Sequence, residues 1–167
     1  TSVSRGLGDV YKRQIHRGPD DSDIWVKEEN GISFSHRRLS IVDLSKAGKQ
    51  PMISSSGRYT ITFNGEIYNH KELRLEIEKK SKYSYPWKGN SDTEIFLECI
   101  EKYGLLKTLE KCCGMFAFAL WDDHKKELSL VRDRFGEKPL YWGINHLEND
   151  KNKRVLVFSS ELSGIFN

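Results

Sequence analysis

The chain has 167 residues, of which 37% are hydrophobic and 31% are charged. A chain of this length forms one domain and can bury a core without disulfides or a structural metal. Its net charge of +3 comes from 27 basic and 24 acidic residues mixed along the sequence, which is not the footprint of a nucleic-acid-binding protein. The longest apolar run, residues 115–121, is far shorter than the ~20 residues that span a bilayer, so no membrane segment is expected.

The cysteine and histidine positions argue against structural metal or disulfide frameworks. Cys99, Cys112 and Cys113 have neither zinc-finger spacing nor the even count of a secreted disulfide scaffold. Free thiols in the cytoplasm fit best, and residues 1–14 lack the apolar segment of a secretion signal. The histidines are isolated and lack ligand spacing, so we expect no metal site; they are His16, His36, His70, His124 and His146.

The first half of the chain predicts strands followed by a helix. Apolar segments bounded by turn residues predict strands at residues 24–26, 32–34 and 59–63. Turn signals separate them at Asn30-Gly31, in a loop at 46–51 and in a turn at 54–57. Asn69 is placed to N-cap a helix with Glu72 at its N3 position, ending near residues 79–80.

The second half begins with the clearest helix of the chain. The sequence SDTE at residues 91–94 is a capping box, and one apolar stripe runs from there to Tyr103 before Gly104 ends it. A short helix at 105–111 follows. Further strands are predicted at residues 115–121, 127–132, 140–144 and 155–159. The polar segment 146–153 shows no sign of order and is predicted to be a loop.

These elements predict an α+β fold. Several strands are apolar on both faces, notably residues 115–121 and 155–158, which favours a sheet covered on each side. At least six strands with two clear helices suit two packed antiparallel sheets flanked by helices.

The end of the strand at 59–63 carries the most informative residues. Asn64 offers a side-chain amide donor, and Gly65 lets a ligand approach its backbone N–H, so the pair could hold an oxyanion during acyl transfer. The same dipeptide is also the commonest hairpin turn. Residues 64–69, which follow the strand, are expected to form a polar loop.

Two further charged residues lie at element ends, where side chains converge on ligands. Arg38 could clamp a carboxylate bidentately, although a surface arginine on a strand is equally consistent. Asp92 could pair with an ammonium group, although an aspartate in the first turn of a helix also complements the helix dipole. Together with an oxyanion pocket, these two groups describe a site for an amino acid with a side-chain amide, namely glutamine.

Several motifs then occur in a recognisable order. They are HRGPD at residues 16–20, RLSIVD at 38–43, NGEIYN at 64–69, SDTE at 91–94, GMFAF at 114–118, RDRFGEKPLY at 132–141 and SSE at 159–161. With these motifs the chain resembles the glutaminase domain of glutamine-hydrolysing asparagine synthetases, a class II glutamine amidotransferase of the N-terminal-nucleophile hydrolase superfamily. The resemblance covers about residues 16–166.

The resemblance implies a fold and a set of site residues. The fold is an αββα sandwich. The oxyanion hole is formed by Asn64 and Gly65, and the α-carboxylate of glutamine is bound by Arg38. The amino end of glutamine is held by Glu66 and Asp92. The remaining residues that line the glutamine site are Leu39, Ser40, Ile41 and Val42.

The resemblance also implies partners. L-glutamine is the substrate, and the released ammonia passes to an ATP-dependent synthetase domain of the same polypeptide, which forms asparagine from aspartate. We expect no cofactor in this chain, whereas ATP and Mg²⁺ would serve the synthetase domain. The resemblance does not decide whether the protein forms a homodimer. It also leaves open whether the ammonia acceptor is aspartate or another carboxylate.

In this family the nucleophile is a cysteine at the mature N-terminus, and its α-amino group is the base. Residues 1–14 do not resemble the family's opening, so we interpret them as an artefactual or disordered segment and residues 15–167 as a type 2 amidotransferase domain without its first strand and helix. Thr1 could replace the cysteine, but no apolar strand follows it. We therefore expect this chain to be a catalytically inactive fragment that lacks the synthetase domain. The alternative is a nucleophile-free module that binds glutamine for regulation.

Overall fold

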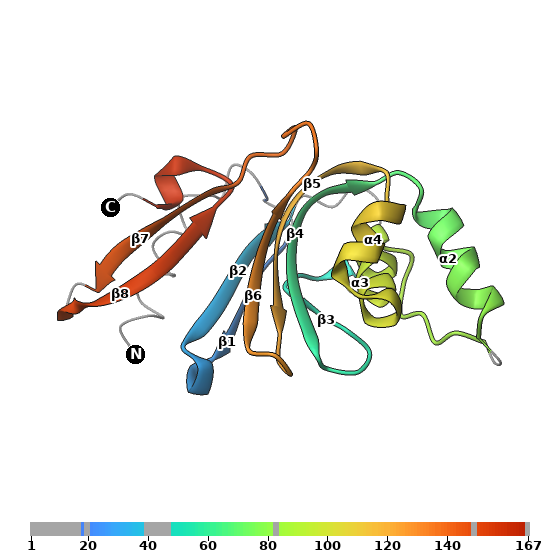
Figure 1. Ribbon diagram of the computed structural model, residues 1–167, viewed down its shortest axis with the longest axis horizontal. Helices are drawn as coiled ribbons and strands as arrows, with labels where there is room; N and C mark the ends of the chain where they lie inside the picture. The colour runs from blue at the N-terminus through green and yellow to red at the C-terminus, as the bar shows by residue number, and fades with distance from the viewer. Residues whose placement is uncertain (1–17, 19–20, 39–47, 82–83, 148–149, 166–167) are drawn as a thin grey trace.

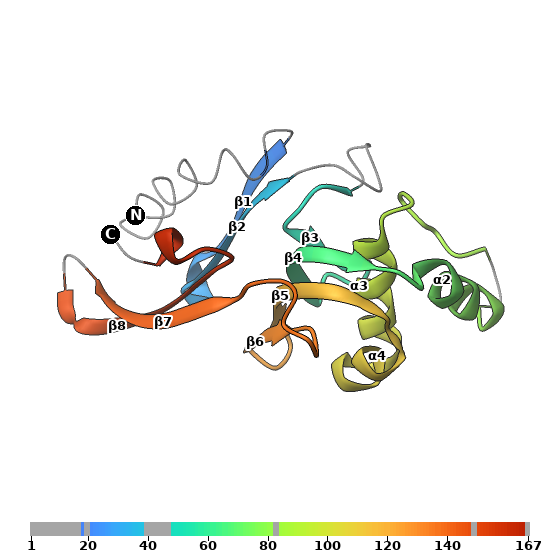
Figure 2. The same ribbon diagram turned by 90° about the horizontal axis from the view of Figure 1, so that it is seen from above.

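The computed structural model describes residues 18, 21–38, 48–81, 84–147 and 150–165, which form three antiparallel sheets and three α-helices. The central sheet has four strands in the order β3-β4-β5-β6. Helices α2, α3 and α4 cover one of its faces, and the two-stranded sheet β1-β2 lies on the other side (Figures 1 and 2). A second two-stranded sheet, β7-β8, lies at the end of the molecule opposite the helices. The α+β class with packed antiparallel sheets is confirmed.

The central sheet consists of β3 (Met52–Ile53), β4 (Tyr59–Ile67), β5 (Gly114–Asp122) and β6 (Glu127–Arg132). The helices are α2 (His70–Lys79), α3 (Asp92–Tyr103) and α4 (Leu105–Lys111). The main core lies between them, because α3 buries Phe96 against Phe63, Phe116 and Phe118 of β4 and β5. Ring centroids in this cluster are 5.4–6.3 Å apart. Burial of these rings fixes α3 and β4 relative to each other.

The opposite face of the central sheet packs on β1 (Asp21–Lys27) and β2 (Ile32–Arg38), which are joined by the 3-10 turn η2 (Glu28–Asn30). A smaller core forms here from Phe34, Ala119 and Trp121. A side-chain hydrogen bond of 3.1 Å between His36 Nδ1 of β2 and Thr62 Oγ1 of β4 links the two sheets. The two sheets are thus tied together on the face of β4 that carries Thr62.

The last hairpin pairs β7 (Tyr141–Leu147) with β8 (Asp150–Ser159), and the 3-10 turn η4 (Leu162–Gly164) follows. Phe158 contacts Phe34 edge to face, with 5.7 Å between the ring centroids, which joins this hairpin to the smaller core. On β7, Trp142, which pairs with Phe158 across the ladder, and Ile144 are exposed.

Most elements lie where the sequence predicted them, and three details are wrong. Residues 64–67 continue strand β4 because β5 begins at Gly114 and extends the ladder to that point, so Asn64-Gly65 is neither a loop nor a hairpin turn. The predicted loop 146–153 is largely strand, because β7 and β8 pair out to Leu147 and Asp150. The predicted turn at Asn30-Gly31 is confirmed, because it joins the antiparallel strands β1 and β2; it has 3-10 geometry, with Gly31 at φ 62°.

The third correction concerns a helix cap. Asn69 precedes α2 as predicted, but its side chain makes no capping hydrogen bond. Its amide instead donates to the carbonyl of Lys111 and accepts from the N–H of Cys113, which ties the start of α2 to the end of α4.

Two sets of predictions lie outside the described residues. They concern residues 1–14 and Leu39–Val42. Among the helices of the described ranges, none has the length and apolar character needed to cross a membrane.

Candidate active site at the edge of strand β4

Three backbone N–H groups line the free edge of β4. The Phe63 N–H donates to the side-chain oxygen of Gln50 at 2.6 Å, so it points away from β5. The Ile67 N–H donates to Oδ2 of Asp92 at 2.9 Å and points the same way. Because backbone direction alternates along a strand, the N–H of Gly65 lies on this edge between them. Strand β3 pairs only with Thr60 and Ile61, so no described strand covers the edge at Gly65.

A glycine is required at this point of the strand. Gly65 has φ 155°, and a Cβ atom there would lie 2.6 Å from the Cα of Phe116 across the ladder. The neighbouring pair is equally close, because a Cβ on Gly114 would lie 3.0 Å from the Cα of Ile67. The two glycines let β4 and β5 approach closely up to the strand end, which keeps the Gly65 N–H on a straight, open edge.

Asn64 and Glu66 place their side chains on one face of β4, the face that also carries Thr62. Both are partly exposed, and among the described residues neither side chain has a hydrogen bond. Asn64 lies opposite Ala117, which has a small side chain. An amide donor and a carboxylate are thus available beside the Gly65 N–H.

Asp92 is held rigidly at the N-terminus of α3. It is buried, with 5% of its surface exposed, and its Oδ1 accepts from the N–H of Thr93 while Oδ2 accepts from Ile67. Ser91 caps the helix as predicted, by accepting from the Thr93 N–H at 3.2 Å. The reciprocal half of the predicted capping box is absent among the described bonds, because Glu94 accepts from backbone N–H groups of the preceding loop. A carboxylate has about four acceptor positions, so Asp92 retains capacity for a ligand cation.

The remaining predicted site residues are not tested by the structure. Arg38 is the last residue of β2, where it pairs with Asp21, and its side chain lies outside what is described. The predicted lining residues Leu39, Ser40, Ile41 and Val42 are outside the described ranges. The structure places Asn64, Gly65 and Glu66 in succession on β4, and it places Asp92 against the N–H of Ile67. Their roles in binding, like that of Arg38, stay predictions.

Sequence reasoning missed two residues beside this site. Gln50 lies in the loop predicted before β3, and no local pattern marks its contact with Phe63. Asp133 lies within the motif at residues 132–141, and no role was predicted for it from the sequence. Its carboxylate is 7% exposed and accepts four backbone N–H groups, from Phe116, Phe135, Glu137 and Lys138.

Asp133 thereby anchors the loop after β6 to the residue that faces Gly65. Burial alone would raise the pKa of Asp133, but the backbone donors outweigh it and lower that pKa to about 2. Nearby, partial burial together with the charges of Glu137, Glu66 and Asp133 raises the pKa of Tyr68. Three carboxylates, those of Glu66, Asp133 and Glu137, therefore lie near Tyr68 at this end of the sheet.

The three cysteines are free thiols, and two are poorly suited to nucleophilic attack. Burial raises the pKa of Cys99 to about 12 and also raises that of Cys112. Cys113 is exposed, and its backbone carbonyl accepts from the Tyr68 N–H. No group of three or more metal-ligating side chains is found within the described ranges.

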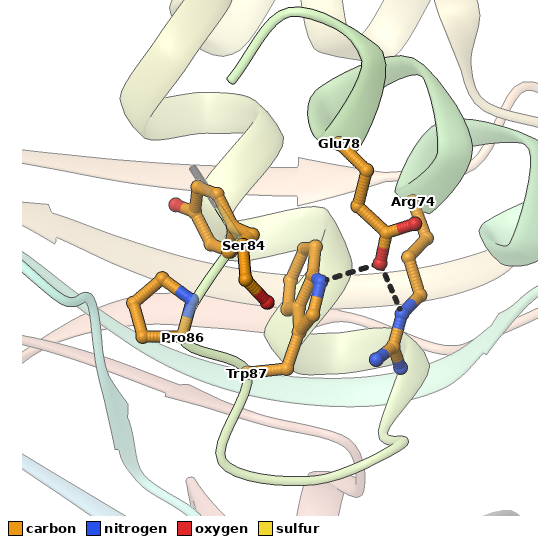
Figure 3. A pocket seen from close by; sticks show the side chains of 6 residues that line it. Arg74, Glu78, Ser84, Pro86 and Trp87 are labelled. Atoms are coloured by element: carbon orange, nitrogen blue, oxygen red, sulfur yellow. Dashed lines mark hydrogen bonds and ion pairs between the residues drawn. The ribbon is translucent and has the colours of Figure 1, made fainter. Parts of the chain in front are cut away.

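A pocket of about 480 Å³ lies between α2 and the loop that leads to α3, apart from the predicted site residues. Figure 3 shows that its charged groups are paired with each other. Arg74 and the Trp87 indole both donate to Oε1 of Glu78, at 3.0 and 2.9 Å. The guanidinium also lies over the Trp87 ring. We interpret this cluster as the anchor of the loop that delivers Asp92.

The antiparallel sheets, with α-helices on one face of the central sheet, define a protein of the α+β class. Comparison with known proteins agrees with this class. The family model described as "Glutamine amidotransferase domain" matches residues 3–167, so the chain belongs to that family. The match begins at residue 3, within the segment 1–14. The interpretation of that segment as artefactual or disordered stays a prediction.

Two curated relatives and one solved structure are similar to the chain. "Asparagine synthetase [glutamine-hydrolyzing] 2" of Bacillus subtilis is 36% identical over 98% of this chain and 19% of its own length. "Amidase chry2" of Gibberella zeae is 36% identical over 87% of this chain and 22% of its own length. Among solved structures, the glutamine phosphoribosylpyrophosphate amidotransferase of B. subtilis aligns with a TM-score of 0.58 and 21% identity over 80% of this chain and 28% of that one, which supports the fold. The chain thus spans about a fifth of the length of these curated relatives.

Proposed function

We propose that this chain is the glutamine-binding, ammonia-supplying domain of an asparagine synthetase. The observation that carries the proposal is the open N–H of Gly65 on the edge of β4, between the bonded N–H groups of Phe63 and Ile67 and next to the Asn64 amide. Two donors on neighbouring residues suit the oxygen of an amide that develops negative charge during hydrolysis.

The rest of the substrate follows from the same strand. Along an extended strand, Gly65 and Ile67 are about 7 Å apart, so the Asp92 carboxylate at Ile67 lies a short distance from the oxyanion position. In the proposal, Asp92 and Glu66 bind the α-ammonium of L-glutamine, and Arg38, with Leu39–Val42, binds its carboxylate. Asn64 and Gly65 stabilise the oxyanion formed when a nucleophile attacks the side-chain amide.

Calorimetric titration of the 167-residue chain with L-glutamine tests this proposal. We expect saturable binding that Arg38→Ala abolishes. Arg37→Ala is the matched control, because the Arg37 guanidinium bonds the carbonyl of Gly18 at 3.1 Å; it should leave the affinity unchanged. A folded wild-type chain that shows no heat of binding at millimolar glutamine would contradict the proposal.

The acceptor of the ammonia is the second part of the proposal. The B. subtilis relative is named a glutamine-hydrolysing asparagine synthetase, which supports aspartate as acceptor, with ATP and Mg²⁺ bound by a synthetase domain of the full-length protein. A cytoplasmic location agrees with three free thiols. The test is asparagine formation by the full-length gene product from aspartate, ATP and glutamine. Ammonia release or amidation of a different carboxylate, without asparagine, would reject this acceptor.

A further inference from the structure

The side chain of Gln50 has no place in the proposed substrate contacts, yet it lies against the site strand. Gln50 is 8% exposed, and its side-chain oxygen accepts the Phe63 N–H at 2.6 Å. Phe63 is itself packed into the main core, against Phe96, Phe116 and Phe118. The Gln50 amide is thus built into the sheet one N–H position before Gly65.

This contact changes what the edge of β4 offers to a ligand. An uncovered strand edge presents a row of equivalent donors. Here the donors on both sides of Gly65 are occupied, that of Phe63 by Gln50 and that of Ile67 by Asp92. Among the described residues, the Gly65 N–H is left between them without such a side-chain acceptor. A ligand oxygen that reaches this edge therefore meets one aimed donor.

We propose that Gln50 is a positioning residue of the oxyanion hole. By holding the Phe63 N–H, it fixes the rotation and spacing of β4, so that the Gly65 N–H and the Asn64 amide keep the direction that the substrate oxygen needs. Gln50 acts through Phe63 and does not touch the substrate. The inference rests on the proposed glutamine site, of which it names a further determinant.

Two variants separate the effect of the hydrogen-bond acceptor of Gln50 from the effect of its side-chain volume. Gln50→Met fills a similar volume but removes the amide oxygen, whereas Gln50→Glu retains an oxygen at the same position. The measurements are amide hydrogen exchange at Phe63 and Gly65, and titration with L-glutamine followed through the Gly65 amide resonance.

In the ligand-free wild type, the Phe63 amide should exchange more slowly than that of Gly65, and glutamine should shift the Gly65 resonance. In Gln50→Met, exchange at Phe63 should rise and the Kd for glutamine should increase by about three- to tenfold, the range of one lost hydrogen bond. Gln50→Glu should retain Phe63 protection and stay within about threefold of the wild-type Kd.

A folded Gln50→Met with wild-type affinity overturns the inference. If Gln50→Met does not fold, Gln50→Glu provides the test. A Gln50→Glu variant that retains the protection of the Phe63 amide but no longer binds glutamine would also overturn the inference. Failure of the proposed function is distinguished from failure of this inference, because in the former case the wild type itself would bind no glutamine. In that case the inference is still judged on the ligand-free protein, where equal protection of Phe63 and Gly65 contradicts it.

Discussion

Gly65 and Phe116 approach so closely across the β4-β5 ladder that a Cβ atom on Gly65 would lie 2.6 Å from the Cα of Phe116. The atoms it would meet are backbone atoms of β5, which cannot rotate away. We therefore expect Gly65→Ala to destabilise the domain by about 3 kcal/mol, since both overpacking and a strained φ contribute. Chemical denaturation measures this loss.

Gly57→Ala is the matched control. Gly57 also has a positive φ, of 78°, but a Cβ atom there would meet nothing within 4 Å. Its cost should be limited to about 1 kcal/mol of backbone strain. Equal destabilisation by the two substitutions would show that the close approach of β4 and β5 adds nothing to the cost of Gly65→Ala.

Asp92→Asn should affect both the fold and the binding of glutamine. The carboxylate accepts the N–H groups of Ile67 and Thr93, and an asparagine amide can serve only one of them. Loss of one bond to a charged acceptor should lower stability by about 1–3 kcal/mol. If Asp92 also binds the ammonium of glutamine, the Kd for L-glutamine should rise about tenfold or more, as measured by calorimetry.

A ligand without the ammonium group separates these effects. 4-Carbamoylbutanoate keeps the carboxylate and the amide of glutamine, so its affinity should fall much less in Asp92→Asn than that of L-glutamine. A parallel fall for both ligands would assign Asp92 a purely structural role.

Stability should decline below pH 4. The Arg58 side chain, which bonds both carboxylate oxygens of Asp122, lowers the pKa of Asp122 to about 2 against the cost of burial. Asp133 also has a pKa of about 2, set by its backbone donors. Both values lie below the ~3.9 of an unfolded aspartate, so their stabilisation is complete above about pH 4 and is lost as the pH falls towards 2.

Asp133→Asn tests this assignment. An amide group would turn an N–H donor towards backbone donors, so the variant should lose about 1–3 kcal/mol at pH 7. Because the titrating group is gone, its stability should also fall less steeply between pH 4 and pH 2 in denaturant titrations. A pH dependence identical to that of the wild type would remove Asp133 from the acid response.

The purified 167-residue chain is expected to release no ammonia from glutamine. A hydrolase depends on its nucleophile, and in subtilisin the removal of the nucleophilic serine lowers kcat by about 10⁶. Cys99 and Cys112 are buried thiols with raised pKa values. Detectable ammonia release that Arg38→Ala abolishes would refute the expectation, and loss of that activity in Cys113→Ser would identify the nucleophile.

Local patterns in the sequence were sufficient for most of the fold. Helix α3 was predicted because Ser91, an apolar stripe and Gly104 are local signals that agree with its burial. The strands were predicted from apolar segments between turn residues. Local patterns do not show which elements meet in space. The assignment of Asn64, Gly65 and Asp92 to one glutamine site therefore depended on the resemblance of several motifs to a known family.

The remaining features depend on contacts between distant residues. The end of β4 was placed too early, because only pairing with Gly114–Ala117 keeps Asn64–Ile67 extended. The Asn69 side chain was expected to cap α2, but the end of α4 competes for it. Gln50 reaches Phe63 across 13 residues, and Asp133 reaches Phe116 across 17, so neither contact is visible in a local window.

A crystal structure of the chain with bound L-glutamine tests the central claim most directly. We predict that the side-chain amide oxygen of glutamine lies within hydrogen-bond distance of the Gly65 N–H and the Asn64 amide, with the α-ammonium at Asp92. Glutamine bound elsewhere, for example in the pocket of Arg74 and Trp87, with the edge of β4 unoccupied, would contradict it.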